Sequence, residues 1–72
     1  MSRPPELPSV RVEHDLRRRL DAEEWDHGQA LPTVARLAEE YGAGKGTINK
    51  VLRVLADEGL VRIVRSWGTF RV

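Results

Sequence analysis

The 72-residue sequence has no cysteine, which excludes disulfide bonds and cysteine-ligated zinc, and with them the zinc-finger class of DNA-binding proteins. It has no long apolar run either, because the longest is the tripeptide Val54-Leu55-Ala56. A membrane-spanning helix needs roughly 20 apolar residues in succession, so none is expected, and the N-terminus has no apolar signal core. The cytoplasm is therefore the expected compartment.

Net charge is also small, at +1, which excludes the strongly basic balance of a histone-like protein. The distribution is uneven, however, because acids cluster at residues 21–26, whereas residues 62–72 contain arginines and no acid. Such a chain can bind nucleic acid on one side and repel it on the other. Its length allows one small domain, which buries only about 60% of its unfolded surface.

Residues 31–60 contain two helical patterns separated by a turn. Each pattern repeats apolar residues at i, i+3, i+4 and i+7, which marks one buried face of a helix. Gly42 stands where the first helix needs a residue that tolerates positive φ, so it is expected to end that helix. Helix, tight turn and helix predict a helix-turn-helix, whose second helix can enter a DNA major groove. The apolar positions are Val34, Leu37, Ala38 and Tyr41, then Ile48, Val51, Leu52 and Leu55.

The outward side of the second of these helices carries polar and basic residues. Lys45, Asn49 and Arg53 recur every four residues, and Thr47 and Lys50 flank them. Such groups suit phosphates and base edges, although a solvated helix surface has the same composition.

The same helix is expected to start near Gly44 and to end at about Glu58, where Gly59 stops it. Gly46 lies in its first turn, where glycine weakens a helix by up to about 1 kcal/mol relative to alanine. Two interpretations stay open. Either the missing side chain allows the backbone to approach a phosphate or base, or the position has little packing and tolerates any residue.

The N-terminal part has two segments. Residues 1–9 are rich in proline and are expected to form a disordered arm, either a frayed end or, through Arg3, a minor-groove contact. A first helix is expected from Val10 to about Glu24, with Ser9 as its N-cap. Its narrow apolar stripe consists of Val12, Leu16 and Leu20, and Trp25 follows at its end.

Residues 17–19 of this helix are three consecutive arginines and look like a nucleic-acid patch. Consecutive residues spread around a helix, however, and Glu13, Asp15 and Asp21 are spaced to pair with them. Solvated helix surface is the favoured interpretation, with backup phosphate contact as the alternative. Beyond this helix, a turn at residues 26–29 and a short strand at Ala30-Leu31 are expected. Pro32 then opens the next helix in its first turn, and Thr33 caps it.

Residues 60–72 have the pattern of a two-stranded hairpin, with strands over 61–65 and 69–72 and a turn at 66–68. Apolar residues alternate with arginines, so one face is expected to cover the helices while the other stays basic. Trp67 at the tip has three open roles: contact with DNA, packing back on the first helix, and self-association. The apolar side would hold Ile63, Phe70 and Val72, and the basic side Arg62, Arg65 and Arg71.

Several short motifs follow one another in a fixed order. Together they resemble the DNA-binding domain of GntR-family bacterial transcription regulators over about residues 10–72. Gly44, Lys45 and Asn49 depart from the residues usual in that family, so the operator sequence stays open. The matching residues are Leu31-Pro32-Thr33, Leu37-Ala38, Gly42, Lys45-Gly46-Thr47-Ile48, Leu52, Leu55, Glu58-Gly59-Leu60 and Gly68-Thr69-Phe70.

This resemblance implies a mainly α fold with a small β-hairpin: a winged helix-turn-helix of three helices and a C-terminal wing. It implies a sequence-specific DNA-binding transcriptional regulator, with double-stranded DNA as its partner. A second copy on the DNA is expected from the small area that one module of this size can bury. The third helix is expected in the major groove, and the wing on the minor groove or backbone. The candidate DNA-binding residues are Thr33, Arg36, Gly44, Lys45, Gly46, Thr47, Asn49, Lys50, Arg53, Arg65, Trp67 and Gly68.

Other classes of function fit less of the sequence. The stretch YGAGKGT is similar to the phosphate loop of nucleotide kinases, but that loop needs a glycine where Glu39 stands and must follow a buried strand. A winged helix that binds a protein remains the alternative, although it would need no basic third helix and wing. No residue set predicts an enzyme, and His14 and His27 lack partners at metal-ligand spacing.

No cofactor and no small-molecule effector are expected for this chain. So short a chain is expected to spare no apolar cavity of about 300 Å³. It is also expected to bind a single DNA half-site weakly as a monomer.

Overall fold

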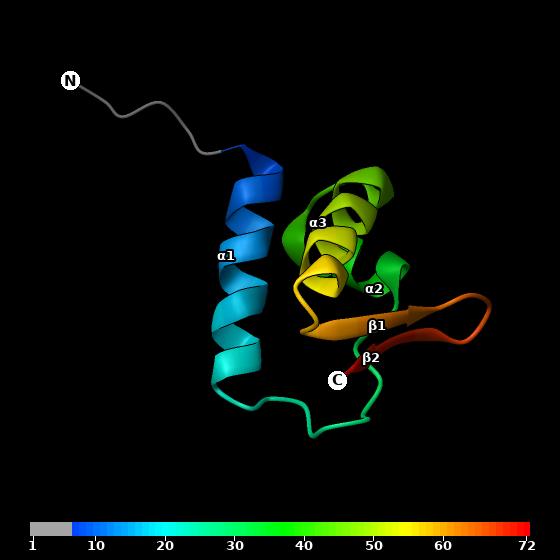
Figure 1. Cartoon of the computed structure of the whole chain (residues 1–72). Coiled ribbons are helices and arrows are strands. Elements are labelled where there is room, and N and C mark those ends of the chain that lie inside the picture. The colour runs from blue at the N-terminus through cyan, green and yellow to red at the C-terminus, as the bar shows by residue number, and fades with distance from the viewer. Residues whose placement is uncertain (1–6) are drawn as a thin grey trace.

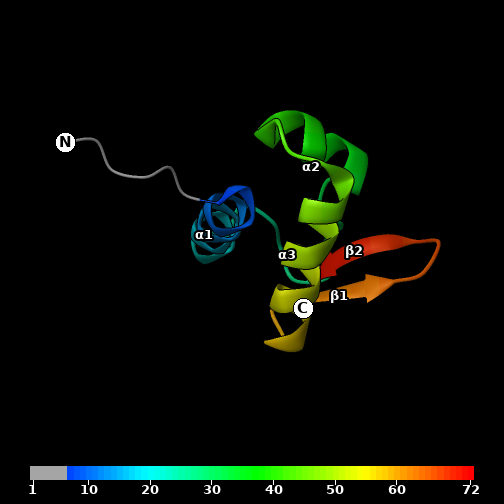
Figure 2. The ribbon, with the colours of Figure 1, turned by 90° about the horizontal axis from the view of Figure 1, so that it is seen from above.

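The computed structural model describes residues 7–72, in which three helices precede a two-stranded hairpin (Figure 1). The helices are α1 (Pro8–Asp21), α2 (Val34–Tyr41) and α3 (Lys45–Asp57), and the strands are β1 (Val61–Val64) and β2 (Gly68–Arg71). Two perpendicular views place α3 between α1 and the hairpin (Figures 1 and 2). The predicted winged helix-turn-helix fold is confirmed. No helix in this part of the chain is long and apolar enough to cross a membrane.

α1 differs from the predicted first helix at both ends. It begins at Pro8, so Ser9 lies inside the helix and is not its N-cap. Proline is favoured in a first helical turn because its missing N–H is not needed there, which accounts for the earlier start. The helix ends at Asp21, earlier than predicted, and Glu23 just beyond it adopts a positive φ of 56°. The rest of the predicted arm, residues 1–6, lies outside the described residues.

The ends of α2 and α3 follow local rules. Thr33 caps α2, because its Oγ1 accepts a hydrogen bond from the amide of Arg36 at 3.1 Å. Pro32 precedes this cap and is not in the first turn, so that part of the prediction was wrong. Gly42 ends α2 with a φ of 60°, and Gly59 follows the end of α3 with a φ of 78°. Both glycines are in the left-handed region as predicted, where a side chain would be strained.

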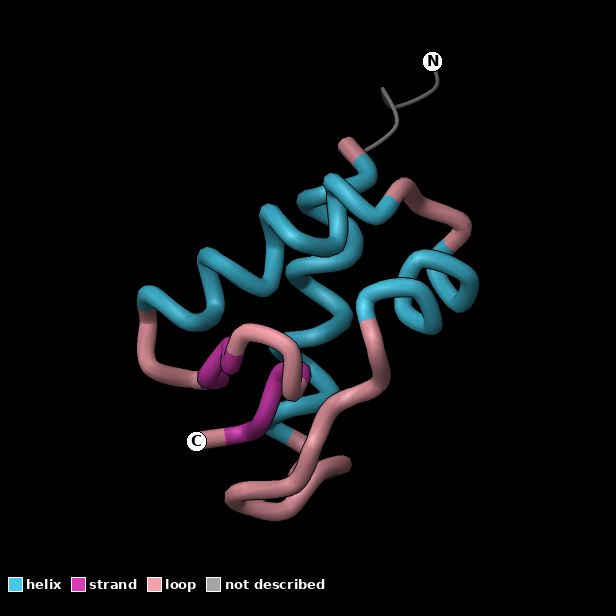
Figure 3. Tube along the Cα trace, turned by 90° about the vertical axis from the view of Figure 1, so that its right-hand side faces the viewer, coloured by secondary structure: helices cyan, strands magenta, loops and turns pink. Residues whose placement is uncertain are grey.

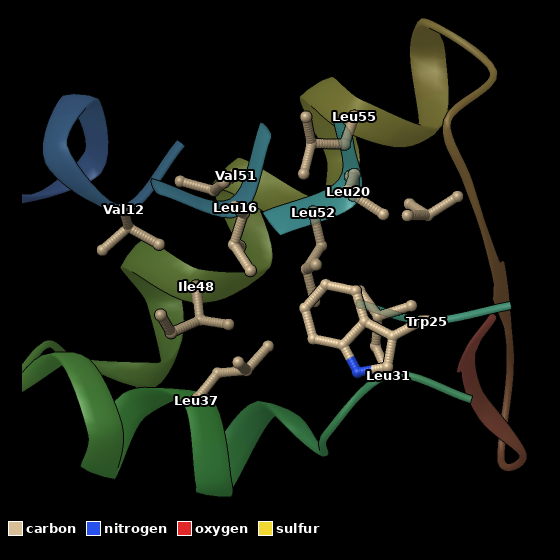
Figure 4. Close-up of a cluster of buried hydrophobic side chains, with 11 residues drawn as sticks. Val12, Leu16, Leu20, Trp25, Leu31, Leu37, Ile48, Val51, Leu52 and Leu55 are labelled. Carbon is tan, nitrogen blue, oxygen red and sulfur yellow. The ribbon is translucent and has the colours of Figure 1, made fainter. Parts of the chain in front are cut away.

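One hydrophobic core joins the three helices and β1 (Figure 4). α1 contributes a single stripe of residues, spaced by about one turn, that packs against α3. The buried stripe of α3 also meets α2 and β1, so three elements share the same helix. The buried members are Val12, Leu16, Leu20, Trp25, Leu31, Leu37, Ile48, Val51, Leu52, Leu55 and Val61.

The base of the hairpin is tied to the loop that precedes α2. β1 and β2 pair antiparallel, and the predicted short strand reduces to one bridge between Ala30 and Phe70. Beside this bridge, the amide of Leu31 donates to the carbonyl of Thr69 at 2.8 Å. The predicted pairing with the hairpin is therefore confirmed.

The two faces of the hairpin are not the ones predicted. Val61 and Thr69 face the core, with 2% and 7% exposure, whereas Ile63 is 48% exposed. In the strand register, Ile63 lies opposite Thr69, on the core-facing side of the sheet but nearer the tip than the buried Val61, while Phe70 lies opposite Arg62. Residues that face one another across an antiparallel pair share one face of the sheet. Ile63 and Phe70 therefore point to opposite faces and cannot cover the helices together.

Trp25 is buried between two arginines that the sequence patterns assigned to the surface. The guanidinium of Arg19 lies 4.7 Å from the centroid of its ring, a cation–π contact. Arg71 donates from Nη1 to the carbonyl of Trp25 at 2.6 Å. Arg71 is thus engaged in the fold and does not belong to a free basic face of the hairpin.

A polar cluster joins α1 to the C-terminal end of α2. The hydroxyl of Tyr41 donates to Oδ2 of Asp15 at 2.5 Å and accepts from Arg19 at 3.0 Å. Arg11 donates to the carbonyl of Tyr41 at 2.8 Å. The hydrogen bonds from Tyr41 and Arg18 hold the pKa of Asp15 below its usual value. Burial and the bond to Asp15 raise the pKa of Tyr41.

The three consecutive arginines of α1 are held by carboxylates, which supports the favoured interpretation for two of them. Arg19 differs, because its side chain is only 15% exposed and belongs to the packed structure. Glu13 and Asp15 act as predicted partners, whereas Asp21 forms no ion pair within residues 7–72. The pairs are Arg17–Glu13, Arg17–Glu58, Arg18–Asp15 and Arg19–Glu24, with Glu40 at the edge of reach of Arg19.

We expect Tyr41→Phe to lower the free energy of unfolding at pH 7 by about 1 kcal/mol, the net value of one hydrogen bond. Asp15 has a lowered pKa when folded, so the unfolded chain binds its proton more readily. Its contribution is therefore present above about pH 4, the unfolded pKa, and is lost as pH falls through the folded pKa. Urea unfolding of both proteins between pH 7 and pH 2.5 should show their stabilities converging in acid. An equal difference at every pH would show that the bond is independent of the charge on Asp15.

Candidate nucleic-acid interface

The outward side of α3 is polar and lies opposite its buried stripe. Lys45, Asn49, Lys50 and Arg53 are all exposed, as predicted, while Thr47 is half-buried at the margin. Since the buried stripe holds α3 against α1, α2 and β1, the outward side faces solvent. The side chains that could bind DNA are therefore presented by a helix with little freedom to move.

Within residues 7–72, the cations on this side of α3 form no ion pair. Among residues 7–72, every ion pair within 4.0 Å uses an arginine of α1. Lys45, Lys50 and Arg53 on α3 and Arg65 in the hairpin have no carboxylate that close in the described part of the chain. Unpaired cations on one surface can meet phosphates without first breaking an internal pair.

A shallow hollow of about 290 Å³ runs along the outward side of α3. It includes Val54 and Asp57, which the sequence patterns did not single out. The sequence could have indicated Asp57, because it follows Gly46 by about three helical turns of 3.6 residues and therefore lies on the same side of α3. The lining residues are Gly46, Asn49, Lys50, Arg53, Val54 and Asp57.

Two glycines stand at the start of α3. Gly44 is the N-cap residue and makes no side-chain cap bond. A Cβ added at Gly44 or Gly46 would meet no atom within 4 Å, and neither residue has a positive φ. Packing and backbone conformation therefore do not require glycine at Gly46. The fold leaves both interpretations open for this residue: close approach of the backbone to DNA, or a position with little packing that tolerates any side chain.

Thr33 and Arg36 form a separate group. Both are exposed, and both stand at the beginning of α2, whereas the turn to α3 follows its end. The hydroxyl of Thr33 is used in capping, and Arg36 supplies the amide that it accepts from. The structure thus brings the α3 candidates together on one side of that helix and leaves Thr33 and Arg36 as a separate pair at the start of α2.

The hairpin presents its tip to solvent. Trp67 is 79% exposed, so it does not pack back on α1, and that interpretation is excluded. Ser66 turns the chain with a φ of 69°, and Gly68 follows with a φ of 121°. Arg65 and Gly68 are exposed beside it. The tip points toward the viewer in Figure 3, away from α1.

The hairpin also carries an open, largely apolar hollow of about 460 Å³. It is a depression of the surface, whereas the sequence-based expectation concerned a cavity within the core. The register produces the hollow, because Val64, Phe70 and the 55% exposed Val72 are not turned toward the core. The lining residues are Gly28, Arg62, Val64, Phe70, Arg71 and Val72.

The phosphate-loop alternative does not fit the structure. The stretch YGAGKGT begins at the last residue of α2 and ends in the first turn of α3, so a helix and not a buried strand precedes it. Within residues 7–72, no three His, Cys, Asp or Glu side chains are grouped to hold a metal ion. His27 instead contacts the carbonyl of Val72 through Nδ1 at 2.8 Å.

The sequence matches known proteins over nearly its whole length. The family model described as "Bacterial regulatory proteins, gntR family" matches residues 8–70. The histidine utilization repressor of Klebsiella aerogenes is 32% identical over 60 residues, which are 83% of this chain and 25% of that protein. The transcriptional regulator TreR of Bacillus subtilis is 25% identical over 60 residues, with the same coverage. The chain thus spans about a quarter of the length of these curated relatives.

Solved structures show the same fold. The DNA-binding domain of AraR in complex with its operator ORE1 aligns with a TM-score of 0.91 at 24% identity, covering 100% of this chain and 88% of that one. A GntR family transcriptional regulator from Listeria monocytogenes aligns with a TM-score of 0.89 at 17% identity, covering 99% of this chain and 62% of that one.

Proposed function

Because the chain belongs to the gntR family of bacterial regulatory proteins, we propose that α3 enters the major groove of duplex DNA and reads base edges there. The chain is a DNA-binding domain of a GntR-type transcription regulator. The observation that supports this arrangement is the outward side of α3, which holds exposed cations without internal ion pairs in the described residues. Such a regulator works on the chromosome, so its compartment would be the cytoplasm.

The residues of α3 divide by chemistry. Asn49 can form a bidentate pair with the N6 and N7 atoms of adenine, the usual contact of an exposed asparagine in the major groove. Three cations suit phosphates: the compact ammonium groups of Lys45 and Lys50 and the planar guanidinium of Arg53. Guanine offers them further acceptors in the major groove. Thr47, half-buried at the margin, suits a phosphate beside the groove.

The ends of α2 and α3 would add backbone contacts. Gly44 and Gly46 have no side chains, so the first turn of α3 can lie close to a phosphate or a base. Thr33 and Arg36 stand at the N-terminus of α2, where the helix dipole favours an anion and the arginine adds a full charge. These contacts would set the angle of the domain on the duplex.

The wing would contact the adjacent minor groove or backbone. Arg65 supplies charge and Trp67 a flat apolar surface, and Gly68 leaves no Cβ between the ribbon and a sugar. In its solved complexes, the AraR domain is bound to operator DNA. For this chain, the proposal rests on the exposure of the wing tip.

A winged helix that binds a protein remains the second candidate. The apolar hollow of the hairpin is the observation that favours it. A protein-binding module would be indifferent to charge reversal on α3, whereas a DNA-binding domain would not. Titration of duplex DNA with the Lys50→Glu variant therefore separates the two functions. Loss of DNA binding supports the DNA-binding function.

We expect Asn49→Ala to relax base preference at about one position of the preferred duplex, at a cost of about 1–3 kcal/mol. Lys50→Ala should instead weaken every duplex and reduce the slope of log K against log salt by about one, because one phosphate contact is lost. Selection of duplexes from a random pool, followed by titration at several salt concentrations, measures both effects. His14→Ala, on the exposed side of α1, is the control. Binding indifferent to both α3 changes would rule out α3 as the reading helix.

Trp67 can be followed without any substitution, because the chain's two tryptophans differ so strongly in exposure, at 5% for Trp25 and 79% for Trp67. Acrylamide should quench two populations of fluorescence in the free chain. If the wing contacts DNA, duplex should protect the accessible population and leave the buried one unchanged. Deletion of residues 66–68 should weaken binding with little loss of helix content. If duplex does not protect Trp67 from acrylamide, and the deletion variant binds DNA with unchanged affinity, the wing has a purely structural role.

We expect the chain to be a monomer that binds one half-site weakly. A single module of this size buries about 600–1,000 Å² on DNA, less than large dimers do. Two half-sites about 34–36 Å apart would place two copies on the same side of the duplex and raise affinity. Sedimentation of the free chain, then titration onto one-site and two-site duplexes, tests this. A stable dimer without DNA, or nanomolar binding to one half-site at physiological salt, would contradict it.

A further inference from the structure

The hollow on α3 is lined by more than the polar side chains expected to read DNA, because Val54 also lines it. It begins at Gly46, where no side chain projects, and continues past Asn49 and Lys50 toward Val54. Val54 is only half-buried, so its side chain contributes apolar surface to the outward side of the helix. The methylene stems of Lys50 and Arg53 line the same hollow and add to that surface. The result is a depression in which apolar surface lies beside an amide side chain and charged groups.

The charges around the hollow restrict what can occupy it. Asp57 lies at its C-terminal end and forms no ion pair within residues 7–72. A carboxylate there repels a phosphate, so the occupant is better uncharged. Lys50 and Arg53, meanwhile, draw the flanking phosphates toward the rim. An uncharged apolar group carried between two phosphate backbones fits this pattern.

In a duplex, the group of that kind in the major groove is the 5-methyl of thymine. We propose that the hollow beginning at Gly46 receives a thymine methyl, and that Gly46 is a determinant of sequence preference. This inference rests on the proposed function of α3. The thymine lies in the base pair that Asn49 reads or in the neighbouring one, because Asn49 lines the same hollow.

The proposal also accounts for glycine at Gly46. Alanine would strengthen the helix, and an added Cβ would meet no protein atom within 4 Å. Within the free protein, then, nothing described favours glycine. A side chain at this position would occupy the space that the methyl needs, so the cost of a larger residue appears only when DNA is bound.

Deoxyuridine tests this, because it differs from thymidine only by the missing methyl. The preferred duplex is first selected from a random pool with the full chain, and each thymine is then replaced singly. One position in the α3 footprint should lose about 3- to 5-fold in affinity, the usual effect of burying one methyl-sized group. Thymine-to-uracil changes outside the footprint are the matched DNA control.

Gly46→Leu links that effect to the hollow. The variant should keep or raise its thermal stability, lose affinity for the thymine duplex, and show less than a 2-fold difference between thymine and uracil. The affinity of Gly46→Ala and its difference between thymine and uracil should lie between those of the unchanged chain and of Gly46→Leu. Circular dichroism and thermal unfolding establish that each variant is folded.

The outcomes separate this inference from the proposed function. Specific binding with no uracil-sensitive position would overturn the methyl pocket and leave α3 as the reading helix. A uracil effect that persists in Gly46→Leu would assign the methyl contact to another part of the chain and overturn it too. If the chain prefers no duplex at all, the proposed function fails and takes this inference with it.

Discussion

The rest of the structure depends on the burial of one side of α3. Ile48, Val51, Leu52 and Leu55 are almost completely buried, and α1, α2 and β1 all pack against this helix. A chain of this size buries only about 60% of its unfolded surface, so it cannot enclose a helix all round. The opposite side of α3 is left to solvent, and the polar residues stand there. One amphipathic helix therefore sets both the core and the candidate DNA-binding surface.

The charges follow the same division. The arginines of α1 are engaged by carboxylates and by the ring of Trp25, whereas the cations of α3 have no such partners in the described residues. Hydrogen bonds from Arg19 and Arg17 hold the pKa values of Glu24 and Glu58 below their usual range. The small net charge thus conceals a chain with one neutralised side and one cationic side, which can orient it as it approaches DNA.

Sequence patterns were sufficient where structure depends on near neighbours. The caps at Thr33, Gly42 and Gly59 follow from local rules, and the exposed residues of α3 follow from the 3.6-residue period. They failed where position depends on distant contacts. Arg71 looked like a surface cation until the strand register placed it beside the carbonyl of Trp25. The period of two in a strand likewise gives alternation but not register, so the faces of the hairpin and its apolar hollow could not be predicted.

The two parts of the candidate interface achieve accessibility in different ways. In α3, accessibility comes from a missing side chain, because Gly46 gives up helix propensity of up to about 1 kcal/mol with no packing reason within the described protein. In the wing it comes from reach, because Trp67 stands at the end of a ribbon whose base is fixed by the hydrogen bond from the amide of Arg71 to the carbonyl of Gln29. A small domain has little stability to spare, so rigidity is most useful at the base of the wing and along the core of α3. Packing then fixes the base of the wing relative to α3, and adaptation to a base or a sugar is left to exposed residues such as Lys50 and Trp67.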